Sequence, residues 1–227
     1  MGATQESTIG LAAVNVGTPS VLAAVKGENV WSGIRKHPVA PTAVLWLSAL
    51  NLGGDGQADL SVHGGVDKAV YAYPSEHLGA WSEELGDGLG PAPFGENLST
   101  IGVLEHEVHI GDVWSWGTAL LQVTQPRWPC FKLALHRGRP DIQARMRSTG
   151  RTGWYLRVLE PGEVAAVGPI RVAAEDPARV SVRDAHLAQA DVHLRDPGAV
   201  KVVAHHPALA EQWRAPLLDR LERQRSH

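Results

Sequence analysis

Apolar residues occur along this chain in short runs, which glycine and proline interrupt after a few positions. Such punctuation is typical of short strands and turns rather than of long helices. It predicts a hairpin from Ser20 to Trp31, with its turn at residues 26–29. Further strands are expected at residues 42–47, 108–110, 113–116, 119–123, 154–159 and 164–173. The pattern therefore predicts a mainly β body, barrel-like, with few helices.

Helical spacing is confined to a few segments. Residues 75–85 place Leu78, Trp81 and Leu85 on one face, with Ser75 as the expected N-cap. Residues 141–148 suit a second short helix closed by Gly150. Both helices would lie within the β body.

The character of the chain changes after residue 175. Ser181 to Asp184 has the form of a capping box, and Asp196-Pro197 can open another helix. The tail repeats large apolar residues every four positions, although Pro216 is expected to kink or split that helix. We therefore expect a β-barrel domain over residues 1–175 and a small helical segment over residues 176–227.

Composition narrows the classes of partner. The 227 residues are 44% hydrophobic and 20% charged, with a formal net charge of −3. This charge gives no electrostatic reason to expect a nucleic acid polymer as a partner, which would require a basic face, although a base remains acceptable as a small substrate. The longest apolar-leaning run is too short to cross a bilayer, and the N-terminus lacks the basic start of a signal peptide. A cytoplasmic protein without a membrane partner is expected.

Cys130 is the single cysteine, so no intrachain disulfide can form. It follows Gln125-Pro126-Arg127-Trp128-Pro129, where two prolines stiffen the backbone. Arg127 and Lys132 are close enough in sequence to favour the thiolate, which binds soft metals. A lone cysteine is nevertheless more often a small buried hydrophobe. The local residues alone leave both interpretations open.

Two further clusters carry polar groups beside glycine. His63, Asp67 and Lys68 surround the Gly64-Gly65 pair, a set able to deliver protons or to hold phosphate. A tight turn with a solvated ion pair is an equally good interpretation.

Phe94-Gly95 precedes Glu96 and Asn97, whose polar groups suit an extended ligand such as a pterin ring. Without a further signal, this segment is more often a turn. Lys36 is a candidate phosphate ligand, although an isolated basic residue is usually solvent-exposed.

In this order, the segments resemble the MOSC family (molybdenum cofactor sulfurase C-terminal domain). Within it the likeness is to the YiiM-type proteins, which are associated with resistance to hydroxylaminopurine. The resemblance covers nearly the whole chain. It is carried by GIRKHPV at 33–39, DGQADLSVHGGVDKAVYAYPSEH at 55–77, FGENLST at 94–100, GDVWSWGTALLQVTQPRWPCFKL at 111–133 and TGRTGWYLRVLEPGEV at 149–164.

The resemblance implies a closed MOSC-type β-barrel that binds the molybdenum cofactor (molybdopterin), with Cys130 as the metal ligand. It implies a pocket lined by residues at the family's motif positions, with Lys36 toward the cofactor phosphate. These lining residues are His63, Asp67, Lys68, Glu96, Asn97 and Arg127. Val66 departs from the family, in which proline is common at this position.

The implied activity is a two-electron reduction of N-hydroxylated compounds such as hydroxylaminopurines. Cys130, His63, Asp67 and Lys68 are the expected catalytic residues, with His63 or Lys68 giving a proton and Asp67 orienting the donor. The sequence has no flavin or iron–sulfur fingerprint, so an external electron-donor reductase is expected. A monomer or a homodimer is compatible with these features. The alternative is a cofactor carrier or sulfur-transfer module in which Cys130 bears a persulfide.

Overall fold

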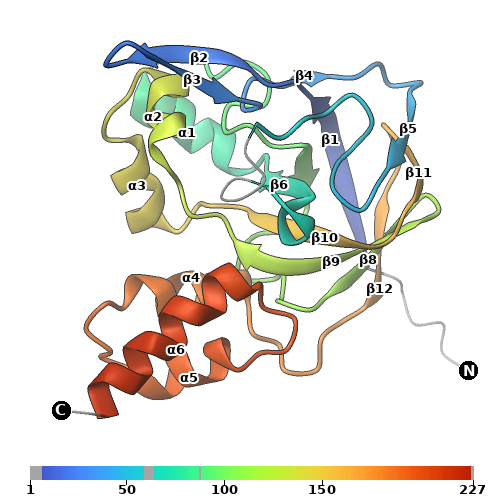
Figure 1. The fold of residues 1–227 in the computed structure, drawn as a ribbon. Coiled ribbons are helices and arrows are strands. Elements are labelled where there is room, and N and C mark those ends of the chain that lie inside the picture. The colour runs from blue at the N-terminus through green and yellow to red at the C-terminus, as the bar shows by residue number, and fades with distance from the viewer. Residues whose placement is uncertain (1–6, 59–63, 87, 226–227) are drawn as a thin grey trace, which may run out of the picture.

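The chain folds around a closed β-barrel (Figure 1). The structure, a computed structural model, describes residues 7–58, 64–86 and 88–225. Seven strands follow one another in the order β12-β8-β9-β10-β6-β7-β1, and β1 pairs back onto β12 to close the ring. The strands are β1 (Thr8–Val16), β6 (Val70–Pro74), β7 (Leu98–Ile101), β8 (Val113–Trp116), β9 (Ala119–Pro126), β10 (Trp154–Glu160) and β12 (Ile170–Ala174). The predicted mainly β, closed barrel is confirmed.

The structure also contains smaller strand pairs beside the barrel. The predicted hairpin is present as β2 (Ser20–Val25) and β3 (Glu28–Ser32), and β4 (His37–Pro38) pairs with β1. β5 (Val44–Leu47) pairs with β11 (Gly162–Ala165). Two strand predictions were wrong. Residues 164–173 are divided between β11 and β12, and residues 108–110 contain only an isolated bridge from His109 to Ser181.

Three helices cover one side of the barrel: α1 (His77–Leu85), α2 (Phe131–Arg137) and α3 (Ile142–Thr149). They enclose an apolar cluster that contains Trp81, Phe94 and Met146. Gly150 closes α3 as predicted, in the left-handed conformation that glycine accepts. Ser75 is not the N-cap of α1, because the helix begins one residue later and Glu76 occupies that position without a side-chain cap.

The chain ends in three helices, α4 (Val182–Ala190), α5 (Pro197–Ala204) and α6 (Glu211–Arg225). The capping box at Ser181 and the Asp196 cap are both present, as predicted. Pro216 does not split α6, which continues past it on both sides. Pro216 is the sixth residue of the helix, beyond the N-terminal amides that lack a partner, so it removes one backbone hydrogen bond without ending the helix.

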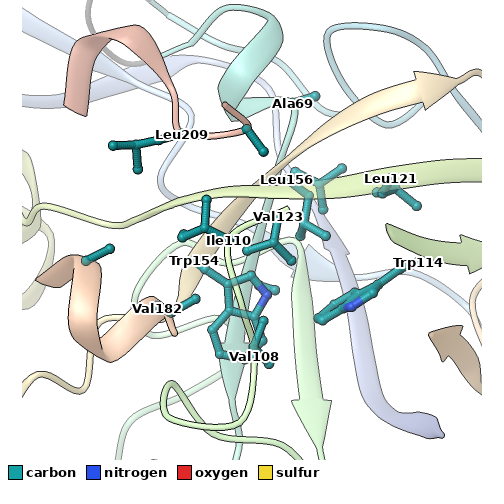
Figure 2. Packing of buried hydrophobic residues seen from close by; sticks show 14 of the residues in the cluster. Ala69, Val108, Ile110, Trp114, Leu121, Val123, Trp154, Leu156, Val182 and Leu209 are labelled. Carbon is teal, nitrogen blue, oxygen red and sulfur yellow. The ribbon is translucent and has the colours of Figure 1, made fainter. Parts of the chain in front are cut away.

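One hydrophobic core runs from the barrel into these helices (Figure 2). Ile110, Val123 and Trp154 of the barrel side share a cluster with Val182 and Leu209 of the helical side. The two parts of the chain thus share one core, and a division into two domains near residue 175 stays a prediction. In the part of the chain that the structure describes, the helices are too short or too polar to span a bilayer.

Candidate functional site

Cys130 lies where the barrel passes into its covering helices. β9 continues to Pro126, paired with Trp154 of β10, and α2 begins directly after the cysteine. The carbonyl of Cys130 accepts a hydrogen bond from the Leu133 amide at 3.0 Å, so the residue occupies the N-cap position. Its side chain is partly exposed and lines two adjoining cavities. The backbone around the thiol is thus held by a strand on one side and a helix on the other.

We call the smaller of these two cavities the inner cavity and the larger one the outer cavity. The charged side chains of the inner cavity are mostly cationic. Its wall comes from several distant segments and includes Lys36, Asp55, Gln57, Lys68, Tyr71, Asn97, Arg127, Cys130, Lys132 and Tyr155. Four of these side chains are basic and one is acidic. Its volume of about 100 Å³ is well below that of typical cofactor pockets. It suits a phosphate-sized group better than a whole pterin.

Lys36 is compensated within this wall. Its ammonium contacts the Asp55 carboxylate in a buried ion pair. Burial lowers the pKa of Lys36 below the usual lysine value, although Asp55 opposes that shift. The other oxygen of Asp55 accepts a hydrogen bond from the Asn97 amide at 2.9 Å. A phosphate approaching Lys36 therefore meets a carboxylate as well as a cation.

Asn97 holds the strands together behind the cavity. Its amide oxygen accepts from the Tyr71 backbone N–H at 3.1 Å, and its nitrogen also donates to the Asn15 carbonyl at 3.2 Å. Both ends of the amide are thus used by the protein itself. Asn97 shapes the cavity and has little capacity left to bind a ring.

Arg127 is a buried fixed charge. Its guanidinium donates to the Phe94 carbonyl and lies over the Tyr71 ring, 4.6 Å from the centroid. Burial raises the pKa of Tyr71 and of Tyr155, so both phenols beside this cation stay protonated. The cation is held in place and accessible from both cavities.

Lys68 faces both cavities beside Cys130. Burial lowers the pKa of Lys68, while the neighbouring Cys130 and Asp67 oppose this shift. Its ammonium donates to the Gln212 side chain of α6 at 2.6 Å and lies 5.9 Å from the centroid of Tyr155. The terminal helices therefore help to position this lysine.

The structure brings together Cys130, Lys36, Lys68, Asn97 and Arg127, and it places two other candidates away from the cavity walls. Glu96 is buried and accepts hydrogen bonds from the Phe94 amide and from Ser99, and burial raises its pKa. Asp67 forms an ion pair with Arg157 at 3.0 Å. His63 falls outside the described residues.

Several wall residues had no signal in the sequence. Tyr71 and Tyr155 read as ordinary strand residues. Gln189, Gln212 and Trp213 line the outer cavity from helices that follow the barrel in sequence. The four-residue stripe in the tail marks Trp213 as apolar, but it cannot tell which surface Trp213 packs against.

Comparison with known proteins agrees with the motifs. Residues 59–176 match the MOSC domain. Protein YiiM of Escherichia coli is 46% identical over 134 residues, 57% of this chain and 59% of YiiM. A Gibberella moniliformis protein named "Reductase" is 38% identical over 124 residues, 53% of this chain and 22% of that protein. The crystal structure of YiiM from Geobacillus stearothermophilus has a TM-score of 0.78 at 32% identity, covering 94% of this chain and 99% of that one. The chain belongs to the MOSC domain family.

Proposed function

We propose that this protein binds a molybdenum–pterin cofactor through Cys130 and reduces N-hydroxylated compounds such as hydroxylaminopurines. The observation that carries the proposal is a partly exposed thiol on the shared wall of two cavities, among fixed cations. A relative named "Reductase" supports redox chemistry.

The donor set fits such a cofactor in its chemistry. Thiolate sulfur is a soft ligand of the kind that binds thiophilic metals. Lys68, Arg127 and Lys132 supply positive charge for a phosphate. Because the inner cavity is too small to enclose a whole pterin, the fit rests on these donors and not on volume.

When bound, the cofactor supplies the two-electron chemistry, R–NHOH + 2e⁻ + 2H⁺ → R–NH₂ + H₂O. Lys68 lies beside Cys130 and, when protonated at Nζ, can give that proton to the departing hydroxyl oxygen. Arg127 provides a fixed cation that needs no rearrangement during the reaction. We propose His63 as a second proton donor from the sequence motif alone. Asp67 is a negative charge that acts on Lys68. The electrons come from a separate reductase.

The test is reduction of 6-hydroxylaminopurine by protein isolated from a cofactor-producing host, with a chemical reductant as electron source. We expect adenine to form with the wild type and formation to be lost in Cys130→Ser. Turnover by Cys130→Ser equal to the wild type would contradict the ligand role. Sulfane sulfur on Cys130 in molybdenum-lacking protein that does not reduce the substrate would instead favour the carrier or sulfur-transfer function.

A further inference from the structure

The outer cavity has a different character from the inner one. It measures about 290 Å³ and lies between the Cys130 segment and the helices α4 and α6. Its wall consists of Lys68, Gln125, Arg127, Trp128, Pro129, Cys130, Tyr155, Gln189, Gln212 and Trp213. Aromatic rings and side-chain amides dominate, and the volume is close to the lower end of the range for small-molecule pockets. Such a wall suits a small, flat, polar ligand.

Two of the glutamines have an unused hydrogen-bond acceptor. The side-chain oxygens of Gln125 and Gln189 are buried and accept no hydrogen bond from the described residues. The Gln125 amide nitrogen donates to the Pro126 carbonyl at 3.3 Å, which fixes which end of that amide remains unused. Buried acceptors without a donor are rare in native proteins. A ligand that brings N–H groups would supply the missing donors.

The aromatic walls are held in place from behind. Trp128 meets Trp213 edge to face, with ring centroids 5.9 Å apart. Its ring also contacts that of His186 at 5.6 Å, and the Arg147 guanidinium lies 5.8 Å from its centroid. The Trp213 indole donates to the Ala185 carbonyl at 3.3 Å. These rings form an ordered surface against which a flat ligand loses little further conformational entropy.

We propose that Gln125 and Gln189 determine substrate specificity by accepting hydrogen bonds from the N–H groups of a planar heteroaromatic amine. The ring of that ligand lies in the outer cavity against the tryptophans, and its reacting nitrogen points toward Cys130. The inference rests on the proposed function for the identity of the reacting end. It gives the terminal helices a role in recognition, because Gln189 belongs to α4.

The test is calorimetric binding of adenine and of purine, which lacks the exocyclic amino group, to the full-length protein without cofactor. We expect the wild type to bind adenine more tightly by about two- to tenfold per hydrogen bond. Gln125→Leu and Gln189→Leu each reduce this preference. Gln189→Glu keeps an acceptor oxygen and retains the preference, as does the control Gln143→Leu on α3, outside the cavity.

Equal binding of adenine and purine by the wild type overturns the inference, as does a preference that survives in both leucine variants. Reduction of hydroxylamine by the cofactor-loaded wild type separates this inference from the proposed function, because hydroxylamine has no ring. If hydroxylamine is reduced but adenine is not preferred, the reductase function stands and the specificity contacts fall. If adenine is preferred through both glutamines but no N-hydroxylated compound is reduced, the contacts stand and the reductase function falls.

Discussion

Trp213 offers the sharpest test of how the terminal helices are joined to the barrel. It is 4% exposed, contacts Trp128 and donates to the Ala185 carbonyl. A buried tryptophan removes about 150–250 Å² from water, which at about 25 cal/mol per Å² corresponds to about 4–6 kcal/mol. Partial collapse around a smaller side chain reduces this loss, so Trp213→Ala should lower the free energy of unfolding by about 3–5 kcal/mol.

The assay is urea unfolding followed by circular dichroism, with Trp31→Ala as the matched control. Trp31 lies on the β2–β3 hairpin and is 51% exposed, so its removal should cost about 0.5 kcal/mol or less. The Trp213 variant should also unfold in a single transition, because its helix shares one apolar cluster with the barrel. A loss no larger than that of the Trp31 variant, or a separate early transition in the wild type, would refute a common core.

Three further predictions follow from the structure. Gly153→Ala should destabilise the protein far more than Gly27→Ala, although both glycines have positive φ. A Cβ at Gly153 would overlap the Ala72 carbonyl oxygen, whereas a Cβ at Gly27 would meet no atom. Equal urea midpoints for the two variants would contradict this. Burial alone would raise the pKa of Glu105, but the hydrogen bond and charge interaction with His77, together with hydrogen bonds from backbone amides, outweigh burial and hold that pKa below 4.5. The unfolded chain then binds more protons than the folded chain, so the free energy of unfolding should fall as the pH drops below about 4.5. Glu105→Gln should lose less of this free energy over the same pH interval, measured by urea unfolding; equal losses in the two proteins would exclude this account. Lys68→Met should lower the rate of N–OH reduction per bound molybdenum about 10²-fold if Lys68 gives the proton. An unchanged rate per molybdenum would remove Lys68 from the mechanism.

Local signals in the sequence predicted the elements whose ends are set locally. The Ser181 capping box, the Asp196 cap and Gly150 each satisfy backbone groups within a few residues, so their effect does not depend on the rest of the fold. The helix after Cys130 was not predicted, because its seven residues are too few to show a clear period of apolar positions and because two prolines precede it. Residues 108–110 look like a strand but pair with the α4 cap, which only the tertiary fold brings near.

The candidate site likewise combines residues that the sequence identifies with contacts that only the tertiary fold creates. Motif likeness identified Cys130, Lys68 and Arg127, which the fold brings to one wall. Sequence could not reveal that Asp55 compensates Lys36, because the pair spans nineteen positions and depends on the loop path. Nor could it place Gln189 beside the thiol, since that contact requires the terminal helices to dock on the barrel.

The central claim is that Cys130 ligates molybdenum, and elemental analysis tests it most directly. Wild type and Cys130→Ser are purified in parallel from a cofactor-producing host and analysed for molybdenum per chain. We expect close to one molybdenum in the wild type and a large loss in the variant, which differs by a single sulfur-to-oxygen exchange. Equal molybdenum in both proteins, or none in the wild type, would contradict the account.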